Sequence, residues 1–485
     1  MDNSLAVCIR GGARICVPRS LQLITPYVLL EQEDWFEDEI RFLRRYLQPG
    51  MRAVDGGASF GIYTMAMAQG VGASGRVWAF EPTPGTADYL QNTLELNQAG
   101  AVKLTRAALS DRPGTVAFQA GEQSELNAVA KDGASGNVQV AALTLDQVAA
   151  EENWGDVDFV KLDVEGHERE VIAGGASLFA SASPLVMFEI KAGDRVDLGT
   201  LPPFRAMGYR FYRLLSEPPV LVPFDEATQP DPFQLNVFAC KDDRIRRLAA
   251  AGLLADGSDA VAQTSGDAWA GYARSAPYAQ KLLRGWPQKA GLFAAADLKL
   301  YLRGLARYAQ SREPALDASA RISLLKQAKQ DVTESIAKKD TLSRRITLSR
   351  LAYALGERWS AVRVLRDAGP RLSAEAYTVL VEPFLAPSLR HEQIAIDVPA
   401  EWLVSAVGEQ LERLKEHSSY YSGTSTLALL DTVVQVPFCS PEMERRRQLV
   451  RMRAGLQAAP EPSPRLCQAS DDNLNVAYWC GGGSA

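Results

Sequence analysis

Up to about residue 240, short apolar runs alternate along the chain with longer segments whose apolar residues recur every three or four positions. Short runs that end in glycine or acidic residues indicate buried strands, and the periodic segments indicate helices. Strands are predicted at 51–55, 76–81, 102–108, 157–163, 185–190, 209–215 and 235–240, and helices at 33–48, 60–69, 85–97 and 167–179. This alternation predicts an α/β fold with a parallel sheet and helices on both faces.

After about residue 241 the strand-like runs stop, and Ala, Leu, Arg and Lys dominate to about residue 456. Apolar residues recur three or four positions apart in 298–310, 343–355, 360–368, 401–416 and 442–456. This pattern predicts an all-α domain. Within it, Leu351–Val362 is similar to the turn of a tetratricopeptide-like helical pair, although only one such unit is clear.

The chain of 485 residues exceeds one ordinary hydrophobic core, so more than one domain is expected. We predict an α/β domain at 1–245, a helical domain at 246–458 and a Pro/Gly-rich tail at 459–485. The last residues, 481–485, are expected to be disordered.

Two hairpins are predicted inside the α/β domain. Cys8 and Cys16 flank Gly11-Gly12, and a three-residue loop would place these cysteines opposite one another, as buried thiols rather than a disulfide. Residues 115–120 and 137–143 alternate apolar and polar positions on either side of a Gly/Ser-rich stretch at 121–136. That stretch is either a lid over a pocket or a simple loop.

Composition excludes some classes of protein. With 52 basic and 58 acidic residues the chain is mildly acidic, which argues against nucleic acid as the main partner. The amino terminus lacks an export signal, and no stretch reaches the roughly 18 apolar residues of a membrane span, so we expect a cytoplasmic protein. Six scattered cysteines and three histidines make a structural zinc site improbable.

A glycine-rich turn follows the first predicted parallel strand, in Asp55-Gly56-Gly57-Ala58-Ser59-Phe60-Gly61. Glycines let the backbone turn sharply and approach a ligand. Glu81, at the end of the next strand, follows Gly57 by 24 positions, near the offset of about 20 at which an acidic side chain meets a ribose diol. The spacing predicts that Glu81 holds two hydroxyls of a nucleoside. The alternative is a plain βαβ crossover whose glycines serve only helix packing.

The type of cofactor follows from what this loop lacks. Pyrophosphate binding favours G-x-G-x-x-G, whereas this loop reads D-x-G-x-x-x-G with Asp55 ending the strand. An acidic side chain there repels a dinucleotide's phosphates and attracts a cation. S-adenosylmethionine, which carries a sulfonium and an ammonium, is therefore the predicted cofactor.

A second polar segment follows the strand at 157–163, in Lys161-Leu162-Asp163-Val164-Glu165-Gly166-His167-Glu168. Open α/β sheets bind ligands at this edge. With the glycine loop, the Phe80-Glu81-Pro82 turn and Phe188-Glu189, this segment resembles the FkbM family of S-adenosylmethionine-dependent methyltransferases, over roughly residues 20 to 240. The resemblance implies a Rossmann-like, seven-stranded class I methyltransferase sheet with one antiparallel strand near its edge.

The motifs and the resemblance together imply roles for individual residues. The cofactor-binding candidates are Asp55, Gly57, Ser59, Phe60, Gly61, Glu81, Pro82, Asn127 and Asp163. Ser59 stands where the family commonly has Asn, and both side chains form hydrogen bonds. Asn127 lies in an insertion that the family places at the pocket, and Trp35 lies in a leading helix that borders the cofactor in related methyltransferases.

His167 is the predicted catalytic base, because it lies directly beyond Asp163 and an imidazole titrates near neutral pH. The alternative is that His167 only caps or orients the following helix. Asp163 is expected at the methionine ammonium of the cofactor, and Glu165 or Glu189 at the substrate. A divalent cation bound by several of these carboxylates is compatible with sugar methyltransferase chemistry, and the sequence does not decide it.

These features predict O-methylation of a hydroxyl, on a carbohydrate or a glycosylated metabolite. Two alternatives stay open: a non-catalytic adaptor that binds partners through its helical domain, and an NAD-dependent oxidoreductase, for which no catalytic Tyr/Lys or His dyad is identified. In the enzyme interpretation the helical domain shapes the acceptor site, forms a dimer or docks a protein partner.

Overall fold

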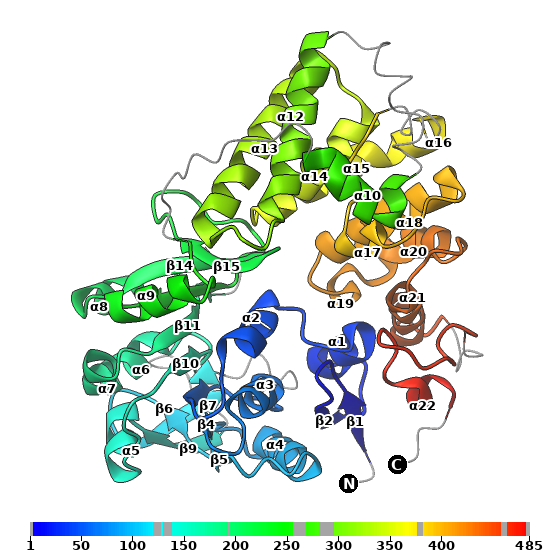
Figure 1. Cartoon of the computed structure of the whole chain (residues 1–485). Helices are drawn as coiled ribbons and strands as arrows, with labels where there is room; N and C mark the ends of the chain where they lie inside the picture. The colour runs from blue at the N-terminus through cyan, green and yellow to red at the C-terminus, as the bar shows by residue number, and fades with distance from the viewer. Residues whose placement is uncertain are drawn as a thin grey trace.

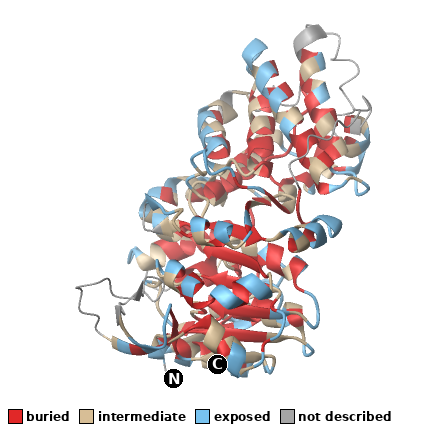
Figure 2. Cartoon of the chain, turned by 90° about the vertical axis from the view of Figure 1, so that its left-hand side faces the viewer, coloured by how far each residue is buried: buried red, intermediate tan, exposed pale blue. Residues whose placement is uncertain are grey.

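The computed structural model describes residues 3–119, 128–129, 138–192, 195–255, 268–280, 295–375, 382–456 and 463–481. A mixed sheet with helices on both faces forms one part of the molecule, and a stack of helices forms the other (Figure 1). Buried residues fill the sheet and the inward faces of the helices in both parts (Figure 2).

The central sheet has eight strands in the order β15-β14-β16-β11-β10-β3-β4-β5. They are β3 (Arg52–Gly56), β4 (Arg76–Phe80), β5 (Val102–Thr105), β10 (Phe159–Leu162), β11 (Leu185–Glu189), β14 (Arg210–Ser216), β15 (Pro219–Pro223) and β16 (Asn236–Cys240). The strands from β11 to β5 are parallel, and β16 runs antiparallel between β11 and β14. The Rossmann-like class I methyltransferase sheet, with its antiparallel strand near one edge, is confirmed.

The eighth strand, β15, is not predicted by the sequence pattern. It pairs antiparallel with β14 at the edge of the sheet, and it begins at Pro219. A proline pair normally indicates a loop, but the first residue of an edge strand tolerates a missing backbone N–H.

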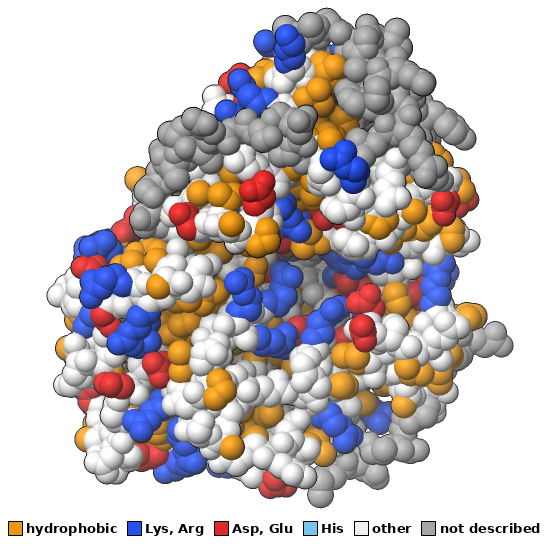
Figure 3. Space-filling model, in the orientation of Figure 1, with side chains coloured by type: hydrophobic (Ala, Val, Ile, Leu, Met, Phe, Trp, Pro, Cys, Tyr) orange, Lys and Arg blue, Asp and Glu red, His pale blue; other side chains and the backbone are white. Residues whose placement is uncertain are grey.

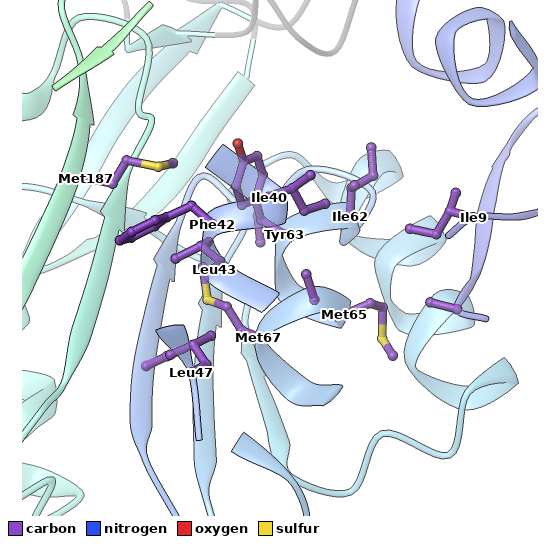
Figure 4. Packing of buried hydrophobic residues seen from close by; sticks show 14 of the residues in the cluster. Ile9, Ile40, Phe42, Leu43, Leu47, Ile62, Tyr63, Met65, Met67 and Met187 are labelled. Carbon is purple, nitrogen blue, oxygen red and sulfur yellow. The ribbon is translucent and has the colours of Figure 1, made fainter. Parts of the chain in front are cut away.

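Successive residues of each strand enter two different hydrophobic layers, as the two-residue repeat of a strand requires. Ala53 and Phe159 pack with α2 (Asp38–Tyr46), α3 (Ile62–Val71) and α4 (Pro84–Leu96). Val54 and Val160 pack with α5 (Leu145–Glu151), α6 (Glu168–Gly174), α7 (Ala176–Ser181) and α8 (Leu201–Ala206). In the first layer, side chains of α2 and α3 lie side by side (Figure 4).

The predicted helix at 33–48 is wrong in its first half. Helix α1 (Ile24–Gln32) ends at Glu33, which has a left-handed backbone with φ of 56°, and α2 begins only at Asp38. Between them the Asp34 carboxylate accepts a hydrogen bond from the backbone N–H of Trp35 and pairs with Arg44. Such a local side-chain bond competes with helix formation, so Trp35 lies outside α2.

Two other predicted elements are each divided in the structure. The helix at 167–179 is α6 followed by α7, with Gly175, a poor helix former, between them. The strand at 102–108 is β5 followed by β6 (Ala108–Leu109), which leaves the central sheet to pair with another strand.

The predicted pair of strands before α5 is confirmed as β7 (Gly114–Gln119) and β9 (Val138–Leu143), which pair antiparallel. They form a four-stranded sheet with β6 and β8 (Ala128–Val129), in the order β6-β9-β7-β8. Most of 121–136 lies outside the described residues, and so does Asn127.

The amino-terminal hairpin consists of β1 (Ser4–Cys8) and β2 (Arg14–Pro18). Cys8 pairs with Arg14 and Cys16 with Ala6, so the expectation that the two cysteines lie opposite one another is wrong. The loop spans 9–13 rather than three residues, which shifts the register. Both thiols are free.

The second half of the chain is helical, as predicted. Its main helices are α9 (Asp242–Ala250), α10 (Ala268–Ser275), α12 (Ala295–Ser311), α13 (Ala318–Lys338), α14 (Leu342–Ala354), α15 (Arg358–Ala368), α18 (Pro399–Leu414), α20 (Leu427–Val433) and α21 (Pro441–Arg453). Their core includes Leu215, Val220 and Val222 of the β14-β15 hairpin, so the helices are seated on the sheet edge. None of the described helices is both long and apolar enough to cross a membrane.

The chain then returns to its own beginning, where α21 packs against α1. The buried Glu31 carboxylate lies 3.3 Å from Arg446 Nη2 and accepts hydrogen bonds from Ser419. Residues 463–481 continue this contact: Asn475 bonds with both backbone groups of Cys8, and Trp479 joins the core of the α/β part. The two ends of the chain therefore lie close together (Figure 1).

We expect Arg446→Ala to lower the free energy of unfolding by about 3–5 kcal/mol, because it leaves the fully buried Glu31 carboxylate without its cation. The neighbouring Arg447, whose side chain is 27% exposed, pairs with the exposed Asp431. Arg447→Ala is the matched control, with an expected loss of at most about 1 kcal/mol. Urea denaturation of both variants measures the difference, and equal losses would contradict the assignment.

Candidate functional site

The glycine-rich loop connects β3 to α3 at the carboxyl edge of the sheet. Gly57 has a φ of 80°, and a Cβ on it would lie 1.8 Å from the carbonyl oxygen of Asp163. Gly61 has a φ of 94°, and a Cβ there would lie 2.5 Å from a methyl group of Leu90 in α4. Both glycines are therefore required by backbone conformation and by close packing on β10 and α4.

Glu81 lies beside this loop at the carboxyl end of β4, as its spacing predicts. Its two oxygens accept hydrogen bonds from the backbone N–H of Ser59, at 2.9 Å, and of Thr83, at 2.8 Å. Burial raises the pKa of Glu81 in spite of these bonds. Pro82 follows directly, and Phe60 packs edge-on against Tyr89. The hydrogen bonds of Glu81 thus connect the glycine-rich loop with the turn that contains Pro82.

A buried lysine joins two of the predicted cofactor residues. Lys161, on β10, is 3% exposed, and its ammonium lies 3.1 Å from the Asp163 carboxylate and 3.5 Å from that of Asp55. It also donates to the carbonyl oxygen of Gly57 and lies over the ring of Tyr63. Burial alone would lower the pKa of Lys161, but the two aspartates raise it above its ordinary value. Lys161 is therefore charged at neutral pH.

Asp55 is fully buried, and its other oxygen accepts a hydrogen bond of 2.6 Å from Thr64. Burial raises its pKa, and Lys161 acts in the opposite direction. Asp163, in contrast, is 40% exposed. Of the two acids, Asp163 has the surface that a ligand can reach, whereas Asp55 acts on the site through Lys161 and the loop.

Glu37, which the sequence analysis does not single out, lies between the helical part and the group formed by Lys161, Asp55 and Asp163. It accepts hydrogen bonds from Tyr63 at 2.5 Å, from Asn236 at 3.1 Å and from the indole N–H of Trp35 at 3.1 Å. Burial, and after it the charge of Asp163, raises the pKa of Glu37. Its donors come from three separate segments of the chain, and no spacing pattern connects them.

Several carboxylates crowd the ends of β10 and β11. Burial raises the pKa of Glu189 to about 9, and the charges of Asp163, Glu165, Glu37 and Glu168 act in the same direction. Glu165 has a left-handed backbone with φ of 54°, and Glu168 accepts the backbone N–H groups of Val164 and Gly166 in the same turn. The predicted residues Asp163, Glu165 and Glu189 are thus brought together as one acidic group.

His167 lies at the start of α6, and its two ring nitrogens have separate neighbours. Nε2 is 3.0 Å from the Ser110 hydroxyl, and Nδ1 is 3.5 Å from the Glu170 carboxylate. Burial lowers the pKa of His167 although Glu170 and Asp111 act to raise it. The ring forms no side-chain cap of α6. It is neutral at pH 7, as a base must be.

Among the described residues, no three His, Cys, Asp or Glu side chains are arranged to hold a metal ion. A cleft opens next to Glu37, between the sheet edge and the helical part, and encloses about 660 Å³ including its open mouth. Glu37 and Asn236 belong both to the wall of this cleft and to the hydrogen-bond network above.

The strand order and the acidic carboxyl edge define a class I methyltransferase fold. Residues 55–211 match the family model of the methyltransferase FkbM domain. This part of the chain is therefore similar to the FkbM domain, the family that its motifs resemble. The hexuronic acid methyltransferase AglP of Haloferax volcanii is 32% identical over 117 residues, which are 24% of this chain and 48% of AglP. The chain thus spans about half the length of this curated relative.

Solved structures of methyltransferases are also similar to this chain. The FkbM methyltransferase from Methylobacillus flagellatus KT is 18% identical, with 39% of this chain and 43% of that one covered and a TM-score of 0.27. A SAM-dependent O-methyltransferase from Thermotoga maritima is 14% identical, with 49% and 78% covered and a TM-score of 0.24.

The pKa of Glu189 predicts how stability depends on pH. Because its folded pKa of about 9 lies above the ordinary value of 4.5, its proton stabilises the fold fully below pH 4.5, and this contribution is lost as the pH rises towards 9. Glu189→Gln removes this dependence. We expect the stability of the variant, relative to the wild type, to increase between pH 5 and 9 in urea denaturation. A difference that stays constant over this range would contradict the assigned pKa.

Proposed function

We propose that this protein is an S-adenosylmethionine-dependent O-methyltransferase that modifies a hydroxyl group of a carbohydrate or a glycosylated metabolite. The observation that carries the proposal is the position of Glu81 at the carboxyl end of β4, bonded to the glycine loop of the FkbM domain. A carboxylate there is placed to accept both hydroxyls of a ribose.

The acidic group at the neighbouring strand ends fits the cationic part of this cofactor. Asp163 is exposed at the edge, and Glu165 and Glu189 lie close enough to influence each other's charge. A ligand with a sulfonium and an ammonium relieves this crowding of like charges, whereas the phosphates of NAD increase it. Asp163 would hold the ammonium, and Glu81 the ribose.

The acceptor class is supported by the curated relative, which acts on a hexuronic acid. When bound, S-adenosylmethionine supplies a methyl group that is already electrophilic. The residues of this chain need to align an acceptor oxygen behind that methyl group, exclude water and take up the hydroxyl proton. Methyl transfer then forms the O–C bond as the C–S bond breaks.

We propose His167 as the group that takes up this proton, with Glu165 and Glu189 in contact with the acceptor. Glu37 is a second candidate base, because it lines the cleft and burial raises its pKa. The two candidates differ in position: His167 contacts Ser110, which directly follows β6, and Glu37 contacts Tyr63 on α3.

Calorimetry with S-adenosylmethionine, S-adenosylhomocysteine and NAD tests the cofactor. We expect the first two to bind and NAD not to bind. Glu81→Gln should weaken S-adenosylmethionine binding by about 10- to 100-fold, since each hydrogen bond to a charged group contributes about 1.5–3 kcal/mol. Glu95→Ala, on the exposed side of α4, is the control and should bind normally. Binding of NAD alone would support the oxidoreductase, and binding of none of the three would support the adaptor.

Kinetics of methyl transfer to an acceptor with a free hydroxyl test the base. His167→Ala should leave cofactor affinity unchanged and lower kcat by about 10²- to 10⁴-fold, the usual contribution of a general base. Because burial lowers the pKa of His167 below 6.5, wild-type activity should fall only on the acidic side of that value. Unchanged turnover in His167→Ala, together with a loss in Glu37→Gln, would transfer the role to Glu37.

A further inference from the structure

The cleft between the sheet edge and the helical part has two chemically different walls. Its floor comes from the α/β part, with acidic residues at the start of α2 and Asn236 at the start of β16. Its roof comes from the turn between α14 and α15, with Arg358 and Gly356, and from Arg213 on β14. Lysine and arginine side chains gather along the hollow between the two parts of the molecule (Figure 3).

The acidic groups of this cleft already have partners. Asp38 forms an ion pair with Arg41, and Glu37 accepts its three hydrogen bonds from Tyr63, Asn236 and Trp35. The two oxygens of Asp231 accept the backbone N–H groups of Phe233 and Trp359. Burial, with the charges of Glu37 and Asp38, raises the pKa of Glu39 to about 8, so Glu39 is largely uncharged at neutral pH.

The two arginines, in contrast, are not paired with a carboxylate of the described residues. Arg213 is half-buried, and its one side-chain hydrogen bond there is to the carbonyl oxygen of Leu355, at 3.1 Å. A guanidinium has five N–H groups, so most donors of Arg213 have no hydrogen-bond partner in the part of the chain that the structure describes, and Arg213 lines the cleft. Its nearest acids are engaged elsewhere, Glu357 with Lys329 and Asp231 with the backbone.

Arg358 is held rigidly by the protein. It donates to the carbonyl oxygens of Leu414, Arg413 and Glu416, and it stacks over the ring of Phe233 at 4.2 Å. His417, next to it, is neutral, because burial and Arg358 itself lower its pKa to about 3. Among the described residues, Arg358 forms no ion pair with a carboxylate, although the charges of Asp38 and Asp231 act on it from nearby.

The turn that the sequence analysis identifies at 351–362 brings these groups together. Gly356 has a φ of 73°, and a Cβ on it would lie 2.3 Å from Arg213 Nη1. The positive φ favours glycine at this turn, and the guanidinium of Arg213 lies directly against it. The helical part therefore contributes directly to the wall of a cleft whose floor includes Glu37, close to the methyl-transfer edge.

We infer that this cleft binds the acceptor, and that Arg213, with Arg358 beside it, binds an anionic group of that acceptor, a carboxylate or a phosphate. The inference rests on the proposed methyl transfer at the adjacent edge. Charge-assisted bonds from a guanidinium fix such a group at the roof. The polar floor around Glu37 and Asn236 then receives the hydroxyls at the other end, and Phe233 and Tyr353 offer ring surface between them.

Ligand-observed NMR titrations of the full chain, saturated with S-adenosylhomocysteine, test this inference with three sugars. The probes are methyl β-glucuronide, glucose 6-phosphate and the neutral methyl β-glucoside. We expect at least one anionic probe to bind about tenfold or more tightly than the neutral one, since an Arg–anion pair is among the strong hydrogen bonds. The tighter of the two anionic probes identifies carboxylate or phosphate as the group.

Arg213→Met should abolish the preference for the anionic probe, and Arg213→Lys should restore part of it by keeping the charge. Arg210→Met is the control, because Arg210 lies on the same strand but is 64% exposed and pairs with Asp242. Equal binding of the three sugars, or an unchanged preference in Arg213→Met, would overturn the inference. Failure of S-adenosylhomocysteine to bind contradicts the proposed function instead, and the three sugars are then compared without it.

Discussion

The carboxyl edge of the sheet depends on one buried ammonium group. Lys161 lies between Asp55 at the end of β3 and Asp163 beyond β10, and it holds the carbonyl of Gly57 in the loop. Without this cation, the buried Asp55 carboxylate would lie near Asp163 with no opposite charge beside it, at a high cost in free energy. Lys161 therefore positions the glycine-rich loop and the ends of β3 and β10 together, and it leaves Asp163 exposed at this edge.

The helical part contacts the α/β part at two separate places. Its core continues into the β14-β15 hairpin, and α21 returns to α1 through the buried pair of Glu31 and Arg446. Attachment at two separate places fixes the turn at Gly356 over the sheet edge. This explains why a cleft with one wall from each part has a defined shape.

Spacing along the chain was sufficient to locate Glu81, Asp163 and Glu189, because each ends or directly follows a buried strand and parallel strands end at one edge. The same reasoning did not reveal the role of Lys161, although a single lysine inside an apolar strand, two positions before an aspartate, is a signal that was available. Glu37, Arg213 and Arg358 carried no such signal. The residues around these three side chains come from distant segments of the chain. Their proposed roles depend on which charged groups form ion pairs and which do not.

The amino-acid sequence by itself determined the α/β sheet, the helical second half and the glycine loop with its acidic partner, because periodicity and turn chemistry are local properties. Only the tertiary structure decided which charges are neutralised. It placed the Gly57 backbone against Asp163, buried Asp55 beneath Lys161 and left Arg213 without a carboxylate partner among the described residues. Burial and pairing depend on contacts between residues far apart in the chain, and no local pattern encodes them.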